Sequence, residues 1–170
     1  MRLLVLIALT TGMRIAEIFA LNWSDVLYRE ELICVRSKLK RGRVRYVPLT
    51  ADLAAELKRF PVVIGGDRIF PPKPGAESGR VEGRFQTILK MTGIENFRFH
   101  DLRHTFASWY IMNGGDLYEL AKILGHSNIK MTERYAKLAK QHIARTGNTA
   151  REMWKLMAGD SGEQAASGTV

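Results

Sequence analysis

The chain has 170 residues, of which 46% are hydrophobic and 25% are charged, the composition of a soluble globular protein. One domain of this length buries about 70% of the surface of its unfolded chain. No apolar run approaches the roughly 20 residues that a membrane-spanning helix needs. The single cysteine, Cys34, excludes an internal disulfide and indicates a reducing compartment.

Lys and Arg number 26 against 17 Asp and Glu, so the formal net charge is +9 and the pI is near 9.9. This excess favours a polyanionic partner, most simply nucleic acid, over an anionic membrane surface. Basic residues are concentrated between Arg36 and Arg45, in the segment "RSKLKRGRVR". We therefore expect a cytoplasmic protein that binds nucleic acid and does not engage a membrane.

The first part of the chain predicts two helices and a β-hairpin. Residues 2–10 and 14–21 read as helices separated by Thr10, Thr11 and Gly12. The first is interpreted as a buried helix and not as a signal peptide, because no small-residue cleavage site follows it. The runs "LICVRS" and "VRYVPL" flank a basic turn and are typical of paired strands.

The rest of the chain predicts a series of helices, at residues 51–60, 79–92, 100–113, 116–124 and 128–138. A loop with at most a short strand at 68–70 precedes the second of them. A last helix is expected at 148–158, and residues 159–170 are polar enough to be disordered. The predicted fold class is therefore α+β, mainly helical, with a small antiparallel three-stranded sheet.

Several chemistries are disfavoured by the motifs. His100 and His104 stand four apart on one helix, but Asp101 occupies the place where a zinc-protease motif has Glu, and Arg103 between them would repel a cation. Phosphate-binding loops of the GxxxxGK[ST] type and the GxSxG motif of serine hydrolases are absent from the sequence. We expect neither a metal nor a cofactor.

Two readings remain open on local grounds. Residues 117–138, "LYELAKILGHSNIKMTERYAKL", predict two helices around a turn at Gly125, which is typical of a DNA-reading helix-turn-helix. Phosphoryl transfer by a side-chain hydroxyl is the other, because it needs cationic donors on the phosphate oxygens. Arg14, directly after a helix break, and Arg103, in a polar helix start, are suitable, since a guanidinium matches phosphate geometry bidentately.

Four segments resemble, in order and spacing, the signatures of the tyrosine recombinases of the phage integrase family. "ALTTGMRIAEIFALNWSDV" is similar to the first signature and "KRGRVRYVPL" to the basic β-hairpin. "FHDLRHTFAS" is similar to the His-x-x-Arg box, and "LGHSNIKMTERYAKL" to the Leu-Gly-His box with the nucleophile segment. The resemblance covers about residues 3–140 and implies the DNA breaking-rejoining fold, with double-stranded DNA as partner and a homo-oligomer, a tetramer, on DNA.

The resemblance implies a role for each matching residue. Tyr135 would attack the scissile phosphodiester and leave a 3′-phosphotyrosyl enzyme, without metal or ATP. Arg14 and Arg103 would clamp the non-bridging oxygens. A tyrosine, with a reference pKa of about 10, needs such a cationic pocket and a nearby base to react.

The other implied roles concern proton transfer and support. Lys40 would protonate the leaving 5′-oxygen, with the neighbouring Lys38 as the competing candidate. His100 would assist proton transfer at the nucleophile, and His126 would hydrogen-bond the phosphate. Glu17 would support the site by pairing with Arg14 or with another basic residue.

His104 has no catalytic duty under this resemblance and is expected to hydrogen-bond or pack within its helix. Further basic side chains are expected to contact DNA, namely Lys38, Arg41, Arg43, Arg45 and Lys130. Lys137 departs from the family, which often has His there, but the position lies outside the catalytic set.

The predicted organisation is a catalytic domain at 1–145, a C-terminal helix at 146–158 and a disordered tail at 159–170. The resemblance implies that the C-terminal helix docks onto a neighbouring protomer, while its apolar residues equally suit packing on its own chain. The family normally has an N-terminal core-binding domain before the first signature, and this sequence begins almost at that signature. We expect either an isolated catalytic domain or fragment, or a naturally short protein, whose DNA clamp would be half complete without that domain. Two alternatives stay open: a type IB topoisomerase-like DNA-relaxing enzyme, and a DNA-binding regulator that uses 116–138 as a helix-turn-helix without chemistry.

Overall fold

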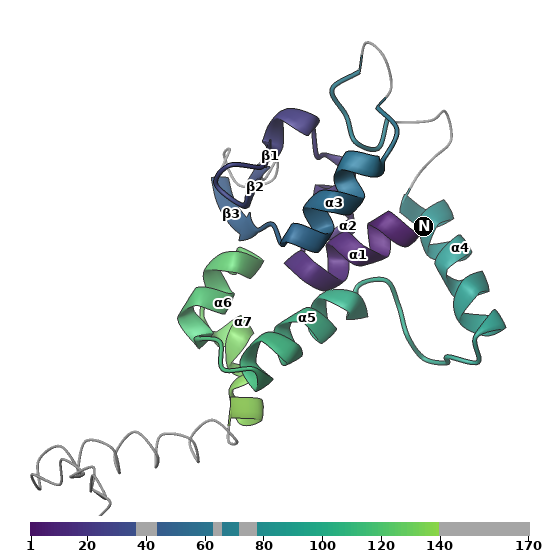
Figure 1. Ribbon diagram of the computed structural model, residues 1–170. Coiled ribbons are helices and arrows are strands. Elements are labelled where there is room, and N and C mark those ends of the chain that lie inside the picture. The colour runs from purple at the N-terminus through teal and green to yellow at the C-terminus, as the bar shows by residue number, and fades with distance from the viewer. Residues whose placement is uncertain (37–43, 63–65, 72–77, 140–170) are drawn as a thin grey trace, which may run out of the picture.

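A computed structural model of the chain describes residues 1–36, 44–62, 66–71 and 78–139. Helices make up most of the molecule, and the small sheet lies at one edge of it (Figure 1). The predicted last helix at 148–158 and the predicted disordered tail fall outside the described residues. The α+β class, mainly helical with one three-stranded antiparallel sheet, is confirmed.

Helices α1 (Arg2–Thr11) and α2 (Ile15–Phe19) are separated at the place that the sequence predicts. Gly12 ends α1 in the left-handed conformation, with φ of +65°, and its N–H donates to the carbonyl of Ala8 at 3.0 Å. A Cβ at Gly12 would lie 2.5 Å from a ring carbon of Phe106 on another helix. Glycine is therefore required here by both backbone conformation and packing.

The sheet has the order β1-β2-β3, from β1 (Val26–Leu27), β2 (Leu32–Arg36) and β3 (Val44–Pro48). The hairpin strands β2 and β3 were located from the sequence, and their register pairs Ile33 with Val47. The third strand, β1, was not located from the sequence because it is only two residues long. The short strand considered at 68–70 is reduced to a single bridge between Asn22 and Arg68.

The remaining elements follow the predicted order, and their bounds are α3 (Ala51–Arg59), α4 (Ser78–Met91), α5 (Asp101–Met112), α6 (Leu117–Leu124) and α7 (Lys130–Glu133). The helix predicted at 128–138 is wrong in length, because the chain there forms the one-turn α7 and a separate 3-10 turn, η2 (Ala136–Ala139). Tyr135 lies between these two short elements.

The buried side chains form two clusters that meet at α5. The larger one joins α1, α2, the sheet, α3, α4 and the start of α5, and includes the fully buried Ile7, Ile18 and Ile33. The smaller cluster joins the second half of α5 to α6 and to the Tyr135 segment, and its buried members are Ala107, Ile111, Leu120, Leu124 and Tyr135. The middle of α5, where Phe106 and Tyr110 pack against both clusters, and the C-terminal end of α6 therefore lie where the two clusters adjoin.

Candidate active site

Two arginines from distant parts of the chain converge on one backbone carbonyl. Arg103, on the first turn of α5, donates to the carbonyls of Gly12 and Leu124, each at 2.6 Å, and is 4% exposed. Arg14, at the N-terminal end of α2, also reaches the Leu124 carbonyl, at 3.5 Å. The helix break after α1 thus supplies both an acceptor for Arg103 and the position of Arg14, so the two predicted clamp residues lie side by side.

Glu17 joins this pair to the sheet. Its carboxylate accepts two hydrogen bonds from the guanidinium of Arg45, at 2.9 and 2.8 Å, and one from Nη1 of Arg14 at 3.2 Å. The backbone N–H of Arg14 donates to the same carboxylate at 2.8 Å, which caps the start of α2. Nε of Arg45 donates to the carbonyl of Ile123 at 2.7 Å. Glu17 therefore pairs with both arginines and ties α2 to β3.

Burial and crowding of charge set the ionisation of this group. Burial, and then the neighbouring charge of Arg14, lower the pKa of Arg103 to about 10. Burial would raise the pKa of Glu17, but the hydrogen bonds and charges of Arg45 and Arg14 hold it below its usual value. At neutral pH the group therefore contains three guanidinium ions and one carboxylate, an excess of positive charge suited to an anion.

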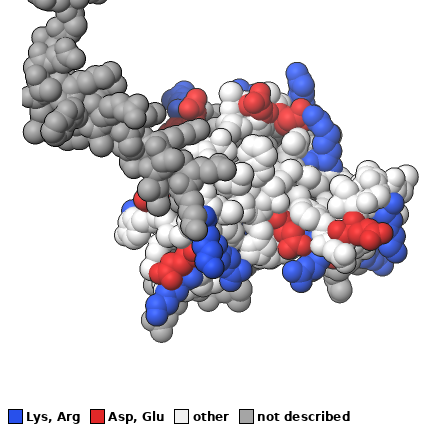
Figure 2. Space-filling view, turned by 90° about the horizontal axis from the view of Figure 1, so that it is seen from below, with Lys and Arg blue, Asp and Glu red and all other residues white. Residues whose placement is uncertain are grey.

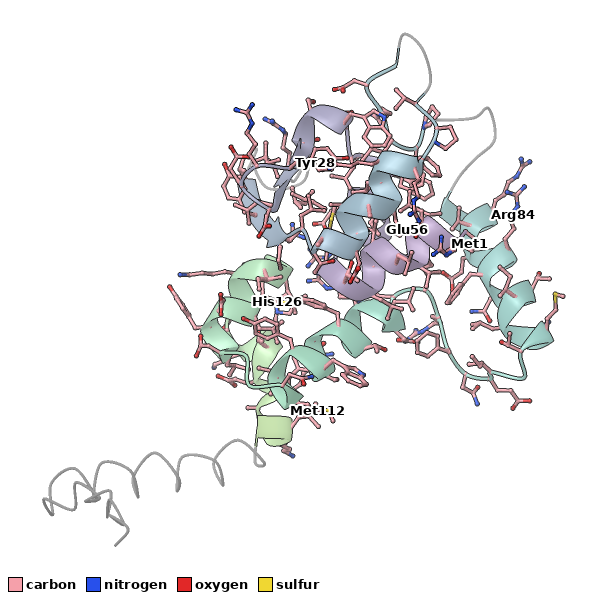
Figure 3. All side chains as sticks on the ribbon, in the orientation of Figure 1. Met1, Tyr28, Glu56, Arg84, Met112 and His126 are labelled. Carbon is pink, nitrogen blue, oxygen red and sulfur yellow. The ribbon has the colours of Figure 1, made fainter. Side chains whose placement is uncertain are left out.

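His126 lies beside this cationic group. It follows Gly125, which ends α6 in the left-handed conformation with φ of +66°, and its N–H donates to the carbonyl of Ala121 at 3.0 Å. Its Nδ1 is 2.8 Å from the hydroxyl of Thr132, a fully buried residue of α7. Figure 3 labels His126 beside α6. Burial, followed by the charges of nearby arginines, lowers the pKa of His126 to about 4, so its ring is neutral at pH 7.

Tyr135 is 6% exposed and packs in the smaller core cluster, on the second half of α5. Its hydroxyl oxygen is 2.5 Å from Nδ1 of His104. Burial raises the pKa of Tyr135, while the charges of Arg134 and Arg103 act in the opposite direction. The charge of Arg103 therefore acts on the pKa of the Tyr135 hydroxyl, and Tyr135 shares its buried cluster with Leu124, whose carbonyl accepts from Arg103.

The contact between His104 and Tyr135 was missed by sequence reasoning, which gave His104 no part in the site. His100, the residue expected to serve the nucleophile, makes no hydrogen bond to Tyr135 within the described part of the chain, and its ring stands edge-on to that of His104 at 5.2 Å. A signal was available, since His104 is four residues from His100 and the two share a helix face. What the sequence lacked was the position of Tyr135 relative to that face.

The residues expected to contact DNA fare differently from one another. Arg45 has a side chain only 13% exposed and is engaged with Glu17 and the Ile123 carbonyl, so it faces the interior of the site. Lys130, the first residue of α7, is exposed. The other three, Lys38, Arg41 and Arg43, lie outside the described residues, as does the predicted general acid, Lys40.

The charged side chains of the surface lie in separate groups. On the face that Figure 2 shows, Lys and Arg gather in groups near the rim, with Asp and Glu close by, and the middle is largely uncharged. Within the described ranges no group of three or more His, Cys, Asp or Glu side chains is arranged to hold a metal ion. None of the helices described there has both the length and the apolar character to cross a membrane.

Comparison with known proteins agrees with this architecture. The phage integrase family model matches residues 1–142, and the chain belongs to this family. The tyrosine recombinase XerC of Xanthomonas campestris pv. campestris is 32% identical over 147 residues, which are 83% of this chain and 45% of that protein. The integrase of Escherichia phage 186 is 35% identical over 146 residues, 82% of this chain and 38% of the relative.

Solved structures resemble the chain as well. The catalytic domain of bacteriophage HP1 integrase is 33% identical, with a TM-score of 0.67, over 86% of this chain and 79% of that one. The XerH site-specific recombinase bound to a palindromic difH substrate, in a post-cleavage complex, is 26% identical, with a TM-score of 0.69, over 86% of this chain and 44% of that one. The chain spans less than half the length of the XerC and phage 186 relatives, and its fold is that of a tyrosine recombinase catalytic domain.

Proposed function

We propose that the chain is the catalytic part of a site-specific DNA recombinase or integrase that cuts and rejoins strands through Tyr135. The observation that carries this proposal is the convergence of Arg14 and Arg103 on the carbonyl of Leu124, whose side chain packs in the same buried cluster as Tyr135. A tyrosine beside buried guanidinium ions is what attack on a phosphodiester requires. Membership of the phage integrase family and the likeness to a recombinase bound to its DNA substrate support it.

In this mechanism the hydroxyl oxygen of Tyr135 attacks phosphorus, and the bond from phosphorus to the 5′-oxygen breaks. Arg14 and Arg103 donate to the non-bridging oxygens, where negative charge grows in the transition state. His126, neutral at pH 7, donates a hydrogen bond to the phosphate, and Lys40 gives a proton to the departing 5′-oxygen. The ester to tyrosine conserves the energy of the broken bond, so a second hydroxyl can rejoin the strand without ATP.

Glu17 and Arg45 act as positioning residues in this proposal. The double hydrogen bond between Arg45 and Glu17 connects β3 to α2. It also fixes the Glu17 carboxylate, which accepts a hydrogen bond from Arg14. β3 begins at Val44, after the segment that carries Lys40, so the same ion pair supports the strand next to the proposed general acid. Exposed basic residues such as Lys130 would contact the DNA backbone, and Arg45 would act from within.

The two alternatives are less well supported. A DNA-binding regulator would need a recognition helix after Gly125, but α7 has only four residues and Tyr135 is buried. A type IB topoisomerase-like enzyme would share the phosphotyrosine chemistry. The two enzyme types are separated by asking whether the product requires two specific sites or only supercoiled DNA.

The experiment that tests the proposal is capture of the covalent intermediate. A pool of nicked duplexes, randomised around the nick, is incubated with the protein and run on a denaturing gel, and the captured DNA is sequenced. We expect a protein–DNA adduct that Tyr135→Phe abolishes while Tyr118→Phe, at an exposed site on α6, retains it. An adduct that persists in Tyr135→Phe would show that another group attacks the phosphate.

We further propose that residues 146–158, with Trp154 as an apolar anchor, dock onto a second copy and that the working form on DNA is a homo-oligomer, a tetramer. The face between α1 and α5 suits an apolar helix, since it is a pocket lined by Leu9, Phe106, Trp109 and Tyr110 among others. Trp109 there is 64% exposed. Sedimentation tests this with the full chain and a chain ending at residue 145, each with the captured DNA. We expect the full chain to sediment as the oligomer and the shortened chain to lose it.

A further inference from the structure

The Tyr135 hydroxyl has a specific partner that the roles described above do not use. Nδ1 of His104 lies 2.5 Å from the hydroxyl oxygen, and the two rings are inclined at 41° with centroids 6.1 Å apart. His104 is on α5, directly after the clamp residue Arg103, so the helix that fixes the phosphate-binding arginine also fixes this imidazole. The contact joins residues 31 apart in sequence and depends on the tertiary structure.

The surroundings of His104 favour a neutral ring. Burial is the main cause that lowers its pKa, followed by the charge of Arg134 next to the tyrosine, and Arg103 and Arg98 act in the same direction. Asp101, one turn earlier on α5, acts in the opposite direction. A neutral imidazole with its hydrogen on Nε2 leaves Nδ1 as an acceptor for the phenol proton.

The two histidines of α5 face different partners. The pKa of His100 is lowered by burial and then by the charges of His104, Arg103 and Arg14, the last two being the proposed clamp residues. The corresponding influence on His104 comes first from Arg134, the neighbour of the nucleophile. His100 is also more open to solvent, at the N-terminal end of the helix. Of the two, His104 is the one in contact with the reacting oxygen.

We propose that His104, and not His100, is the general base for Tyr135; this inference rests on the proposed function of Tyr135 as the nucleophile. As the tyrosine oxygen forms its bond to phosphorus, its proton moves to Nδ1 of His104. The bond from phosphorus to the 5′-oxygen breaks, and that oxygen takes a proton from the general acid. In the rejoining step the imidazolium returns the proton to Tyr135 as a strand hydroxyl displaces it.

The burial of Tyr135 gives this base its importance. Burial raises the pKa of the phenol, so the fraction ionised at neutral pH is small even with Arg103 and Arg134 nearby. With a base within hydrogen-bond distance, the reaction does not depend on the ionised fraction of the phenol, because the proton moves to the base as the new bond forms. General-base assistance of this kind contributes about 10²–10⁴-fold to a rate.

The test compares single-turnover cleavage rates of the wild type, His104→Ala, His104→Gln and His100→Ala on a nicked duplex recovered from the capture experiment. We expect both His104 variants to cleave at least about 100-fold more slowly and to lose the fall in rate that protonation of the base causes at acidic pH. Free imidazole should restore cleavage in His104→Ala, in proportion to its concentration, and should have no such effect in His100→Ala. Urea unfolding of each variant shows whether the fold is retained, and His104→Gln keeps a polar side chain if the alanine variant does not fold.

The outcomes separate this inference from the proposed function. An adduct that forms in the wild type and is lost in Tyr135→Phe, while folded His104→Gln cleaves within threefold of the wild type, would overturn the role of His104 alone. Faster cleavage in the His104 variants would mean that the contact restrains the tyrosine, and imidazole rescue confined to His100→Ala would make His100 the base; both overturn the inference. An adduct retained in Tyr135→Phe would overturn the proposed function itself.

Discussion

The proposed active site has a cationic side, formed by Arg14, Glu17, Arg45 and Arg103, and a nucleophile side, which carries the proposed nucleophile and is formed by His104, His126, Thr132 and Tyr135, and the two are built differently. The cationic side is fixed by buried backbone carbonyls and one carboxylate that join α1, α2, β3, α5 and α6. On the nucleophile side, Tyr135 is carried between two elements of four residues each.

Short helices have little stability of their own, so the segment from α7 to η2 depends on the small cluster that Tyr135 completes. The cationic side, in contrast, adjoins the main core of the domain. We therefore expect the Tyr135 segment to open at a lower free energy than the arginine clamp. The difference teaches that the arginine cluster is held together by the main core of the domain, while the proposed nucleophile is held by a few contacts, each of which a single substitution can remove.

The largest effect is expected from removal of Arg103. Arg103→Ala should lower the rate of adduct formation by about 10²–10³-fold, because a donor to the transition-state charge is lost. It should also lower the free energy of unfolding by about 1–3 kcal/mol, since the carbonyls of Gly12 and Leu124 lose their donor. Cleavage kinetics and urea unfolding measure the two effects.

The control for that experiment is Arg84→Ala, at an exposed position on α4, which Figure 3 labels. We expect the unfolding free energy of this variant within about 0.5 kcal/mol of the wild type. If Arg103→Ala folds with wild-type stability, the hydrogen bonds of the buried guanidinium do not hold the cationic side together.

The next largest effect is expected from Arg45→Met, which should lower mainly the free energy of unfolding. It removes both hydrogen bonds to Glu17 from a pair whose side chains are 13% and 12% exposed, and leaves a buried carboxylate with Arg14 as its remaining cation. Loss of one partner of a buried pair costs about 3–5 kcal/mol, and we expect the lower end because Arg14 remains. Urea unfolding measures the loss.

Arg2→Met offers a matched comparison, because Arg2 makes the same double hydrogen bond to a glutamate, Glu56, with a side chain 75% exposed. An exposed pair of this kind contributes less than about 1 kcal/mol. Equal losses in the two variants would mean that burial of the Arg45 pair has no special part in holding the cationic side.

The place of Arg45 shows what the sequence could and could not predict. Alternation along a strand puts Arg45 on the same face as the buried Val47, so its inward direction was readable from the spacing. The basic composition of the hairpin favoured instead the interpretation that Arg45 points outward and contacts DNA. The glutamate that receives Arg45 is 28 residues away, and no local pattern predicts that pair.

The helices and the break at Gly12 could be predicted because apolar spacing and glycine chemistry act locally. The arginine clamp was predicted through family motifs, and its geometry depends on carbonyls 91 and 21 residues from Arg103. The contact of His104 with Tyr135 could not be derived, because it depends on where a one-turn helix places its neighbour. The division of the predicted helix at 128–138 has the same cause, since tertiary packing of Tyr135 overrides the helical periodicity.

Thr132→Val tests the nucleophile side with a change of nearly constant volume. It removes the hydroxyl that lies 2.8 Å from Nδ1 of His126, at a fully buried position, and should cost about 1 kcal/mol of stability. Cleavage should fall by about tenfold, because an imidazole that has lost one buried hydrogen bond is held less firmly. Unfolding and adduct kinetics measure the two changes.

Thr87→Val is the corresponding control, because the Thr87 hydroxyl donates only to the Gly83 carbonyl of its own helix and is exposed. It should leave cleavage unchanged. A Thr132→Val enzyme as fast as this control would mean that His126 is oriented by something other than the buried hydroxyl.

A further prediction is a dependence of stability on pH. The pKa of His126 is about 4 in the folded chain and near 6.5 in an unfolded one. Between these values the unfolded state binds a proton that the folded state does not, so the free energy of unfolding should fall as pH drops from about 6.5 to about 4 and no further on account of this residue. His100 and His104, whose pKa values are also lowered by burial, add to the same slope.

Urea midpoints measured across that range, for the wild type and His126→Gln, test the assignment. The variant should have a shallower slope, because its side chain does not titrate, while the part due to His100 and His104 remains. Glu17 acts in a separate window, since its lowered pKa adds stability that is lost only below the usual range of a glutamate. An unchanged slope in His126→Gln would mean that burial and the neighbouring arginines do not lower the pKa of His126 in the folded chain. The ring of His126 would then not lie against the cationic side of the proposed site.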